Sequence, residues 1–427
     1  MEHTLQDLRI KQALPLSIKV NMTVARIKAW VDHFGLDGVY VSFSGGKDST
    51  VLLHIARSIY PDIKAVFVDT GLEYPEIREF VKGFDNVDWI RPKLTFKQVI
   101  EKYGYPFISK ETAECVQGAR KYLTELEKSG KLVKTDRQTD RQTDRLSTPT
   151  NTINYAERVN TRNFTLPPLP ITKRWQEEVG GGTITNTVNF EELESLLKRK
   201  MQNREGGANE RLLILLGKLP PKSTKEIIPD KSKYNQERYK FFLDAPFEIS
   251  NKCCNVMKKA PAHEYGRKTG RVPILATMAE ESRLRTQKWL QNGCNGFDMK
   301  SPVSTPMAFW TENDVLQYIK ENNIEICSVY GDIVPDYCGD QFDGQMDIAD
   351  FGLADDTRKL KTTKCDRTGC MFCGFGCHLE KESRFVRMKE THPKQYEFIM
   401  KPKDKGGLGY AEIIDWINKH GGFNIKY

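Results

Sequence analysis

The chain of 427 residues carries 65 lysine and arginine residues against 57 aspartate and glutamate residues, a formal net charge of +8 at pH 7. This length suits two or three domains, or one domain with large insertions. The hydrophobic fraction of 39% is typical of a soluble globular protein, and no run of about 18 apolar residues predicts a membrane-spanning helix. Because the first residues lack a signal-peptide pattern, we expect a cytoplasmic protein without a membrane partner.

The modest positive charge favours attraction of a small polyanion such as a nucleotide. A nucleic-acid substrate stays open, although the sequence has no dense block of lysine and arginine with interleaved aromatic residues. The sequence does not indicate an oligomeric state.

Helical and strand-like patterns alternate in the first quarter of the chain. Apolar residues at helical spacing and short β-branched runs predict helices over residues 23–34, 49–59 and 75–81, and strands over 38–43, 63–68 and 87–90. This alternation predicts an α/β fold with a mostly parallel sheet and helices on both faces. Later patterns predict a strand over 272–278, a capping box at 311–314 before a helix over 315–320, and a helix over 410–420.

The middle of the chain interrupts this alternation. Residues 135–145 repeat the letters TDRQ without an apolar residue, so we expect a disordered loop there. Helices are expected over 191–201 and 210–216. The sequence thus predicts a first part of the α/β domain, a partly disordered insertion, a second part of that domain, and a cysteine-rich segment with a C-terminal helix, with bounds at 1–109, 110–239, 240–360 and 361–427.

A glycine-containing loop stands between the first predicted strand and the helix that follows it. Its sequence is Ser44-Gly45-Gly46-Lys47-Asp48-Ser49. Glycines allow close approach of the backbone to an anion, and a helix N-terminus offers unpaired N–H groups with a partial positive charge. The lysine adds a charge and the serines add hydroxyl donors. The string resembles the PP-loop of the adenine nucleotide alpha-hydrolase superfamily, and it is not a Walker A loop.

Two further motifs narrow the resemblance to the phosphoadenosine phosphosulfate (PAPS) reductase family. They are Asp69-Thr70-Gly71 before Tyr74-Pro75-Glu76, and Glu281-Ser282-Arg283-Leu284-Arg285. The resemblance covers roughly residues 25–105 and 240–380. It implies a Rossmann-like fold, an adenine nucleotide as ligand (ATP, PAPS or adenosine phosphosulfate, APS), and catalytic roles for Lys47, Asp48 and Arg285. It also implies nucleotide binding by Ser44, Gly45, Gly46, Lys47, Asp48, Ser49, Asp69, Thr70, Gly71, Glu281, Ser282 and Arg285.

The side chains of these motifs indicate, independently of the resemblance, what they can bind. Arginines near a strand end can clamp phosphate or sulfate in bidentate fashion, or they can pair with Glu280 or Glu281. Asp69 follows a predicted strand, where it is placed to bind Mg²⁺ or a ribose hydroxyl.

Ten cysteines in a long chain without a secretion signal favour metal binding or catalysis over disulfides. A Cys-Cys pair with a distant Cys-x-x-Cys resembles the [4Fe–4S] ligand set of iron–sulfur sulfonucleotide reductases, with zinc as the alternative. The candidate ligands are Cys253, Cys254, Cys370, Cys373 and Cys377. The alternative local set of four thiolates adds Cys365 to the last three of these.

Three functions remain open at this stage. The resemblance implies a sulfonucleotide reductase, but no cysteine follows Cys377 to serve as the family's C-terminal nucleophile. A PP-loop enzyme that inserts sulfur into tRNA, DNA or a small molecule with ATP is the alternative. The third is a nucleotide-binding regulator without catalysis. The enzymatic readings imply a reductant or a sulfur-donor protein as partner.

Overall fold

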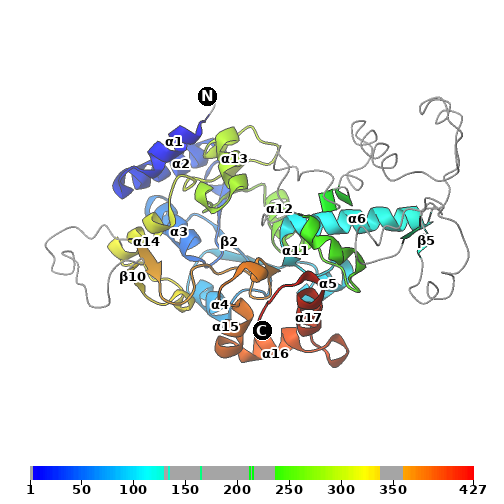
Figure 1. Cartoon of the computed structure of the whole chain (residues 1–427). Coiled ribbons are helices and arrows are strands. Elements are labelled where there is room, and N and C mark those ends of the chain that lie inside the picture. The colour runs from blue at the N-terminus through cyan, green and yellow to red at the C-terminus, as the bar shows by residue number, and fades with distance from the viewer. Residues whose placement is uncertain are drawn as a thin grey trace, which may run out of the picture. The chain divides into compact units, whose positions relative to one another are not determined.

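The computed structural model describes residues 3–128, 133–134, 164–165, 211–212, 214–215, 236–336 and 359–427 (Figure 1). The chain forms two compact units, each built from two stretches of sequence. The first unit comprises Met1–Phe96 and Cys254–Phe372, and the second comprises Lys97–Cys253 and Cys373–Tyr427. The four-part division made from the sequence stays a prediction.

A six-stranded sheet forms the centre of the first unit, with the strand order β3-β2-β1-β7-β9-β8. Every neighbouring pair is parallel except β8 and β9. The predicted α/β class with a mostly parallel sheet flanked by helices is therefore confirmed. The strands are β1 (Val39–Ser42), β2 (Ala65–Val68), β3 (Val87–Ile90), β7 (Val272–Ile274), β8 (Asn295–Gly296) and β9 (Val303–Ser304).

Helices connect and cover these strands (Figure 1). Those of the first unit are α1 (Leu5–Gln12), α2 (Leu16–Phe34), α3 (Lys47–Ile59), α4 (Pro75–Lys82), α12 (Ala260–Thr269), α13 (Arg283–Asn292) and α14 (Glu312–Glu321). A separate antiparallel pair joins β10 (Ile333–Pro335) to β11 (Leu360–Thr362).

Strand β1 lies where the order of the sheet reverses. It pairs with β2 on one side, with Val41 opposite Ala65, and with β7 on the other, with Val41 opposite Ile274. In open parallel sheets, ligands collect at the carboxyl ends of the strands at such a reversal. The segments that follow β1, β2 and β7 contain the three motifs predicted to bind a nucleotide.

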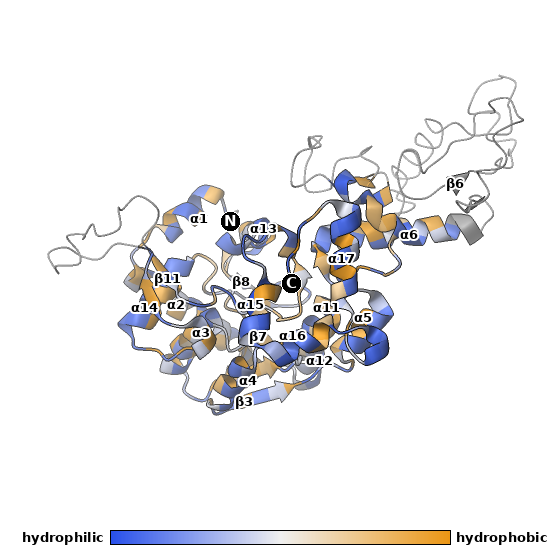
Figure 2. Cartoon of the chain, turned by 60° about the horizontal axis from the view of Figure 1, so that its bottom comes forward, coloured by the Kyte–Doolittle hydropathy of each residue, from blue (hydrophilic) through white to orange (hydrophobic). Residues whose placement is uncertain are grey.

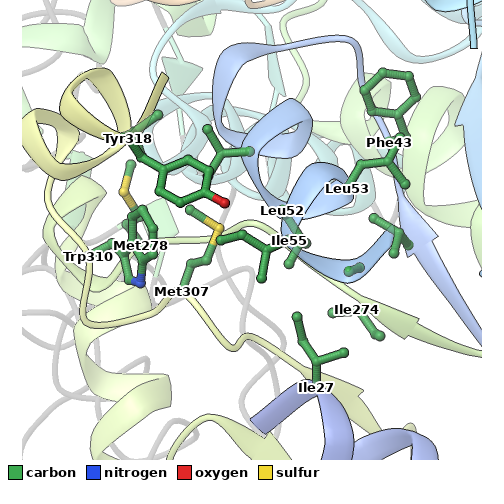
Figure 3. Close-up of a cluster of buried hydrophobic side chains, with 14 of the residues drawn as sticks. Ile27, Phe43, Leu52, Leu53, Ile55, Ile274, Met278, Met307, Trp310 and Tyr318 are labelled. Atoms are coloured by element: carbon green, nitrogen blue, oxygen red, sulfur yellow. The ribbon is translucent and has the colours of Figure 1, made fainter. Parts of the chain in front are cut away.

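Buried apolar side chains from the helices and the sheet form the core of this unit. Figure 3 shows Ile27 of α2, Leu52 and Ile55 of α3, and Ile274 of β7 in one cluster. Trp310 belongs to the same cluster, and its indole N–H donates to the hydroxyl of Thr23 at 2.9 Å. Burial of this apolar surface supplies most of the driving force that fixes the sheet and the segments at its edge.

The second unit is built mainly from helices. Its pairs of strands are short, with β4 parallel to β12 and β5 antiparallel to β6. Its elements are β4 (Phe107–Ile108), α6 (Lys110–Lys128), β5 (Val133–Lys134), β6 (Phe164–Thr165), β12 (Gly374–Phe375), α15 (Arg384–Thr391), α16 (Pro393–Met400) and α17 (Tyr410–Gly421). The chain passes between the units at three points, in the short helices α5 (Phe96–Tyr103) and α11 (Lys252–Cys254) and between Phe372 and Cys373.

Most elements predicted in the first unit are present, with shifted ends. Strand β3 has the predicted bounds, and Thr311 and Asp314 form the predicted capping box of α14. Helix α2 begins seven residues before the predicted residue 23. Its first turns contain the buried residue Lys19, which is polar, so the apolar pattern of the sequence does not reveal them. The predicted strand 272–278 is shorter, because its neighbour β9 has only two residues.

Several predictions concern residues that the structure does not describe. The repeat at 135–145 and the helix at 191–201 lie outside the described residues. Within the predicted helix 210–216, residues 211–212 and 214–215 are helical. Among the helices in the described part of the chain, none has the length and apolar character needed to cross a membrane.

A buried ion pair connects α2 to α14. Lys19 is 2% exposed, and its ammonium group donates to Asp314 Oδ2 at 2.6 Å and to the carbonyl of Gln12 at 2.6 Å. The same carboxylate oxygen accepts from the backbone N–H of Thr311 at the start of α14. Figure 2 shows hydrophilic and hydrophobic residues alternating along α14, as in an amphipathic helix. The ion pair of Lys19 with Asp314 therefore lies on the buried side of α14.

We expect the substitution Lys19→Met to lower the free energy of unfolding by about 3 kcal/mol, because it leaves the buried Asp314 carboxylate without its cation. Lys28→Met, at an exposed position of the same helix, is the matched control and should change this free energy by less than about 0.5 kcal/mol. Urea denaturation measures both values. Equal stability of the two variants would show that the pair contributes little.

Candidate functional site

The loop between β1 and α3 has the geometry of an anion-binding turn. Gly45 has a φ of +71°, and a Cβ at this position would lie 2.7 Å from Val81 and 2.8 Å from Ile77 of α4. Only glycine fits both this conformation and this contact. Gly46 precedes the first residue of α3, so the N–H groups at the start of the helix face the loop.

The two serines of the motif hold the loop in shape. The backbone N–H of Ser44 donates to Ser49 Oγ at 3.1 Å, and the two hydroxyl oxygens lie 3.1 Å apart. Ser49 Oγ also donates to the carbonyl of Gly46 at 2.9 Å. The hydroxyl of Ser49 is thus used within the loop, whereas Ser44 is exposed.

Lys47 is the first residue of α3 and is almost entirely buried, with 2% of its surface exposed. Its ammonium group donates to the carbonyl of Asp366 at 2.7 Å and lies 3.1 Å from Glu312 Oε1. Asp48 Oδ1 is 3.8 Å from the same nitrogen. A buried cation is costly without such acceptors, so these contacts keep the charge at the loop.

Tyr330 occupies the position in which a helix N-terminus normally receives an anion. The backbone N–H of Lys47 donates to the hydroxyl oxygen of Tyr330 at 3.0 Å. This hydroxyl is also 2.7 Å from Thr368 Oγ1, and burial raises the pKa of Tyr330 above its ordinary value. A Cβ at Gly46 would lie 3.2 Å from the Tyr330 hydroxyl and 3.3 Å from that of Thr368. The tyrosine and the threonine therefore lie directly against the loop.

Asp48 is the acidic member of the loop. Burial raises the pKa of this carboxyl group above its usual value, and the charge of Glu312 acts in the same direction. The charges of Lys47, Arg367 and Arg285 oppose this shift. Three cationic side chains therefore lie close enough to Asp48 to affect its ionisation.

The second motif, which follows β2, is held by its own hydrogen bonds. Asp69 Oδ2 accepts from Arg78 at 3.0 Å and from Arg91 at 3.1 Å, while its buried Oδ1 has no hydrogen-bond partner among the described residues. The backbone N–H of Thr70 donates to Glu73 at 3.0 Å. Gly71 has a φ of +73°. The free Oδ1 is the atom that a metal ion or a ribose hydroxyl would contact.

Two arginines, one of the third motif and one of a later segment, lie beside the carboxylate of Glu281 in this motif. Arg285 forms an ion pair with Glu281 Oε2, and Arg367 Nη1 lies 3.7 Å from Glu281 Oε1. Ser282 caps α13, because its hydroxyl accepts from the backbone N–H of Arg285 at 3.4 Å. Burial lowers the pKa of Arg285, and the positive charge of Arg367 acts in the same direction. Of the two roles that the sequence leaves open for Arg285, the pairing with Glu281 is present.

Sequence reasoning missed several residues around the loop: Glu312, Tyr330, Asp366 and Thr368, which contact it, and Arg367, whose charge acts on Asp48. They come from segments hundreds of residues away, so no local spacing connects them to the motif. The sequence offered one signal for Arg367, which is its position within the cysteine-rich segment. That segment was interpreted only through its cysteines.

The first unit contains three of the candidate thiol ligands, Cys254, Cys365 and Cys370. Burial alone would lower the pKa of Lys258, but the negative charges of Cys370, Glu73 and Cys254, together with a hydrogen bond to Cys370, raise it. Lys258 lies in a single π-helical turn, Asn255–Lys259, that directly follows Cys254. Lys258 thus lies close to both Cys254 and Cys370 and is hydrogen-bonded to the latter.

The second unit contains the other three candidates, Cys253, Cys373 and Cys377. Burial raises the pKa of Tyr410 well above its ordinary value, and the negative charges of all three thiols contribute to this shift. Burial also raises the pKa of the Cys377 thiol to about 12. Within the described residues, no group of three or more His, Cys, Asp or Glu side chains is arranged to hold a metal ion. The predicted ligand set therefore stays a prediction.

A parallel α/β sheet with a glycine turn, a buried lysine and a helix N-terminus at its point of reversal defines a nucleotide-binding protein of the PP-loop type. The sequence profile of the phosphoadenosine phosphosulfate reductase domain matches residues 38–161 and 219–374, which is more than half of the chain. The chain therefore belongs to the PAPS reductase family of PP-loop enzymes.

One curated relative is an uncharacterized protein of Methanocaldococcus jannaschii. It is 38% identical to this chain over 73 residues, which are 16% of this chain and 18% of that protein. The chain thus aligns with less than a fifth of the length of this relative.

We expect the substitution Tyr330→Phe to tighten ATP binding about fivefold, because it removes a competing acceptor from the Lys47 N–H, at about 1 kcal/mol for a neutral hydrogen bond. Isothermal titration calorimetry measures the dissociation constant. Tyr318→Phe removes a hydroxyl that bonds His54 at 3.1 Å instead, and serves as the matched control. Weaker binding by Tyr330→Phe would show that the hydroxyl contacts the nucleotide itself.

Proposed function

We propose that this protein is an enzyme that binds an adenine sulfonucleotide, PAPS or APS, at the PP-loop and takes part in its reduction. The observation that carries the proposal is the buried ammonium group of Lys47 at the N-terminus of α3, where the backbone N–H of Lys47 donates to the Tyr330 hydroxyl, an acceptor that phosphate oxygens can replace. Together they supply a positive charge and N–H donors at one point, which suits the phosphate end of a nucleotide.

The residues of the three motifs have separate roles in this proposal. The loop from Ser44 to Ser49 binds the phosphate, and Lys47 neutralises charge that develops there. Arg285 contacts the terminal sulfate or phosphate once the nucleotide replaces Glu281 as its partner. Asp69, with its free Oδ1, contacts the ribose or a Mg²⁺ ion.

Reduction of a sulfonucleotide breaks the bond between the sulfate sulfur and the bridging oxygen. It consumes two electrons and releases sulfite with the adenosine phosphate as leaving group. The positive charges at the loop stabilise that leaving group. The electrons come from an external reductant, which is the partner class that this proposal requires.

The alternative is a sulfur-insertion enzyme that consumes ATP. In that reaction the acceptor attacks the α-phosphate, pyrophosphate leaves, and sulfur from a donor then displaces the adenylate. One contact favours this reading. The Cys365 thiol, only one residue from Asp366, donates to the carbonyl of Arg367 at 3.0 Å. A thiol that donates in this way is a poorer nucleophile than a thiolate. The acceptor would be tRNA, DNA or a small molecule.

The two reactions differ in the product they release. We expect the wild-type protein, purified anaerobically and given a reductant, to release sulfite from PAPS or APS and no pyrophosphate from ATP. The substitution Lys47→Ala should abolish this turnover, because it removes the charge that stabilises the leaving group. Ion chromatography for sulfite and a coupled assay for pyrophosphate make the measurement.

The control for this experiment is Lys82→Ala, which removes an exposed lysine paired with Glu79 on α4 and should leave turnover unchanged. Pyrophosphate without sulfite would replace the reductase proposal with the sulfur-insertion alternative. Nucleotide binding with neither product would instead support a regulator without catalysis.

We also propose that the cysteines hold a [4Fe–4S] cluster, with zinc as the alternative metal. The support is the spacing of Cys253, Cys254, Cys370 and Cys373, with Cys377 as a further candidate ligand. Thiolates are the ligands that such clusters require, and the ammonium group of Lys258 lies close to two of these cysteines, Cys254 and Cys370. When bound, the cluster would supply a redox-active anionic group.

We expect anaerobically purified protein to contain iron and acid-labile sulfide in equal amounts, with a yellow-brown colour. Changing Cys370 to Ala should remove both, whereas changing Cys115, which lies outside the predicted ligand set, should remove neither. Elemental analysis and absorption spectroscopy measure the content. Stoichiometric zinc without sulfide would contradict the cluster.

A further inference from the structure

Arg367 lies in sequence between Asp366 and Thr368, which are both connected to the PP-loop by hydrogen bonds, one directly and one through Tyr330. The carbonyl of Asp366 accepts from the Lys47 ammonium group at 2.7 Å. On the other side, Thr368 Oγ1 lies 2.7 Å from the Tyr330 hydroxyl, which accepts from the Lys47 backbone N–H. Because its neighbours are fixed on both sides, the backbone of Arg367 is held beside the loop.

The guanidinium of Arg367 has only a weak partner there. Its Nη1 is 3.7 Å from Glu281 Oε1, which is longer than a hydrogen bond, and the side chain is 56% exposed. The described part of the chain provides no hydrogen-bond acceptor for this side chain. Glu281 already pairs with Arg285 through its other oxygen. One carboxylate therefore serves two guanidinium groups.

Placing two guanidinium groups together is unfavourable unless an anion lies between them. The repulsion is visible in Arg285, whose pKa is lowered by burial and then by the charge of Arg367. The same two charges act on Asp48 in the loop. Lys47 and the N-terminus of α3 add further positive potential. The carboxylates of Asp48, Glu281 and Glu312 balance these charges in the free protein, but Arg367 is the cation whose nearest carboxylate is the most distant and whose side chain is the most exposed. It is therefore the cation best placed to exchange its internal partner for an anionic ligand.

We propose that Arg367 is a binding residue for the anionic group of the nucleotide that lies beyond the α-phosphate. In this arrangement it leaves Glu281 and, together with Arg285, donates N–H groups to that oxyanion. The ligand class is a tetrahedral oxyanion in an anhydride, either a phosphate of ATP or the sulfate of APS. This inference rests on the proposed function, because it needs the nucleotide to occupy the PP-loop.

The test compares dissociation constants for ATP and for APS, measured by isothermal titration calorimetry on the full-length protein. We expect Arg367→Ala to weaken binding at least tenfold, which is the usual effect of losing a hydrogen bond to a charged group. Arg367→Lys should recover only part of the loss, because lysine lacks the planar fork. Lys82→Ala is the matched control for net charge.

The outcomes separate this inference from the proposed function. If Lys47→Ala abolishes binding while Arg367→Ala binds both nucleotides like the wild type, Arg367 only pairs with Glu281 and the inference is wrong. If Lys47→Ala binds normally, the proposed function itself fails. A loss with ATP alone or with APS alone identifies phosphate or sulfate as the group that Arg367 binds. An unchanged denaturation midpoint for Arg367→Ala shows that the loss is not one of folding.

Discussion

The burial of the Lys47 ammonium group is the constraint on which the candidate site depends. A cation removed from water needs acceptors close by, and here they come from remote parts of the chain. The carbonyl of Asp366 and the carboxylate of Glu312 supply them. As a result, the loop after β1, the start of α14 and the segment before the cysteine-rich motif all meet at one nitrogen atom. Moving either of the two remote segments would remove one of the close acceptors of this charge.

The donors of the site are held by acceptors of the chain itself. Glu281 serves both Arg285 and Arg367, and Tyr330 accepts from the N–H at the start of α3. A nucleotide that binds here exchanges these internal acceptors for its own oxygens. The net affinity is therefore the difference between two sets of hydrogen bonds, so removing an internal acceptor tightens binding and removing a donor weakens it.

The cysteine-rich segment is continuous in sequence with the residues that contact the phosphate loop. Cys370 follows Thr368 by two residues, and the backbone N–H of Met371 donates to the carbonyl of Leu72 after the second motif at 2.8 Å. Lys258 is hydrogen-bonded to Cys370 within the same unit. The segment that touches the phosphate loop is thus continuous with a candidate metal ligand. A shift of Cys370 would therefore be transmitted along only a few residues to the segment at the phosphate loop.

The sequence by itself determined the fold class, the position of the phosphate loop, and the order in which strands and helices follow one another along the chain. These features are local, because hydrophobic periodicity and a glycine turn between a strand and a helix need only a few adjacent residues. The bounds of β3 and the capping box at Thr311 were predicted for the same reason.

The tertiary structure alone decided what surrounds the loop. Tyr330 and Arg367 lie near Lys47 because the sheet order and the core bring their segments together. The early start of α2 has the same cause, since Lys19 becomes a buried residue only when Asp314 is there to receive its charge. Contacts between segments hundreds of residues apart follow from packing, and no pattern along one stretch of sequence encodes them.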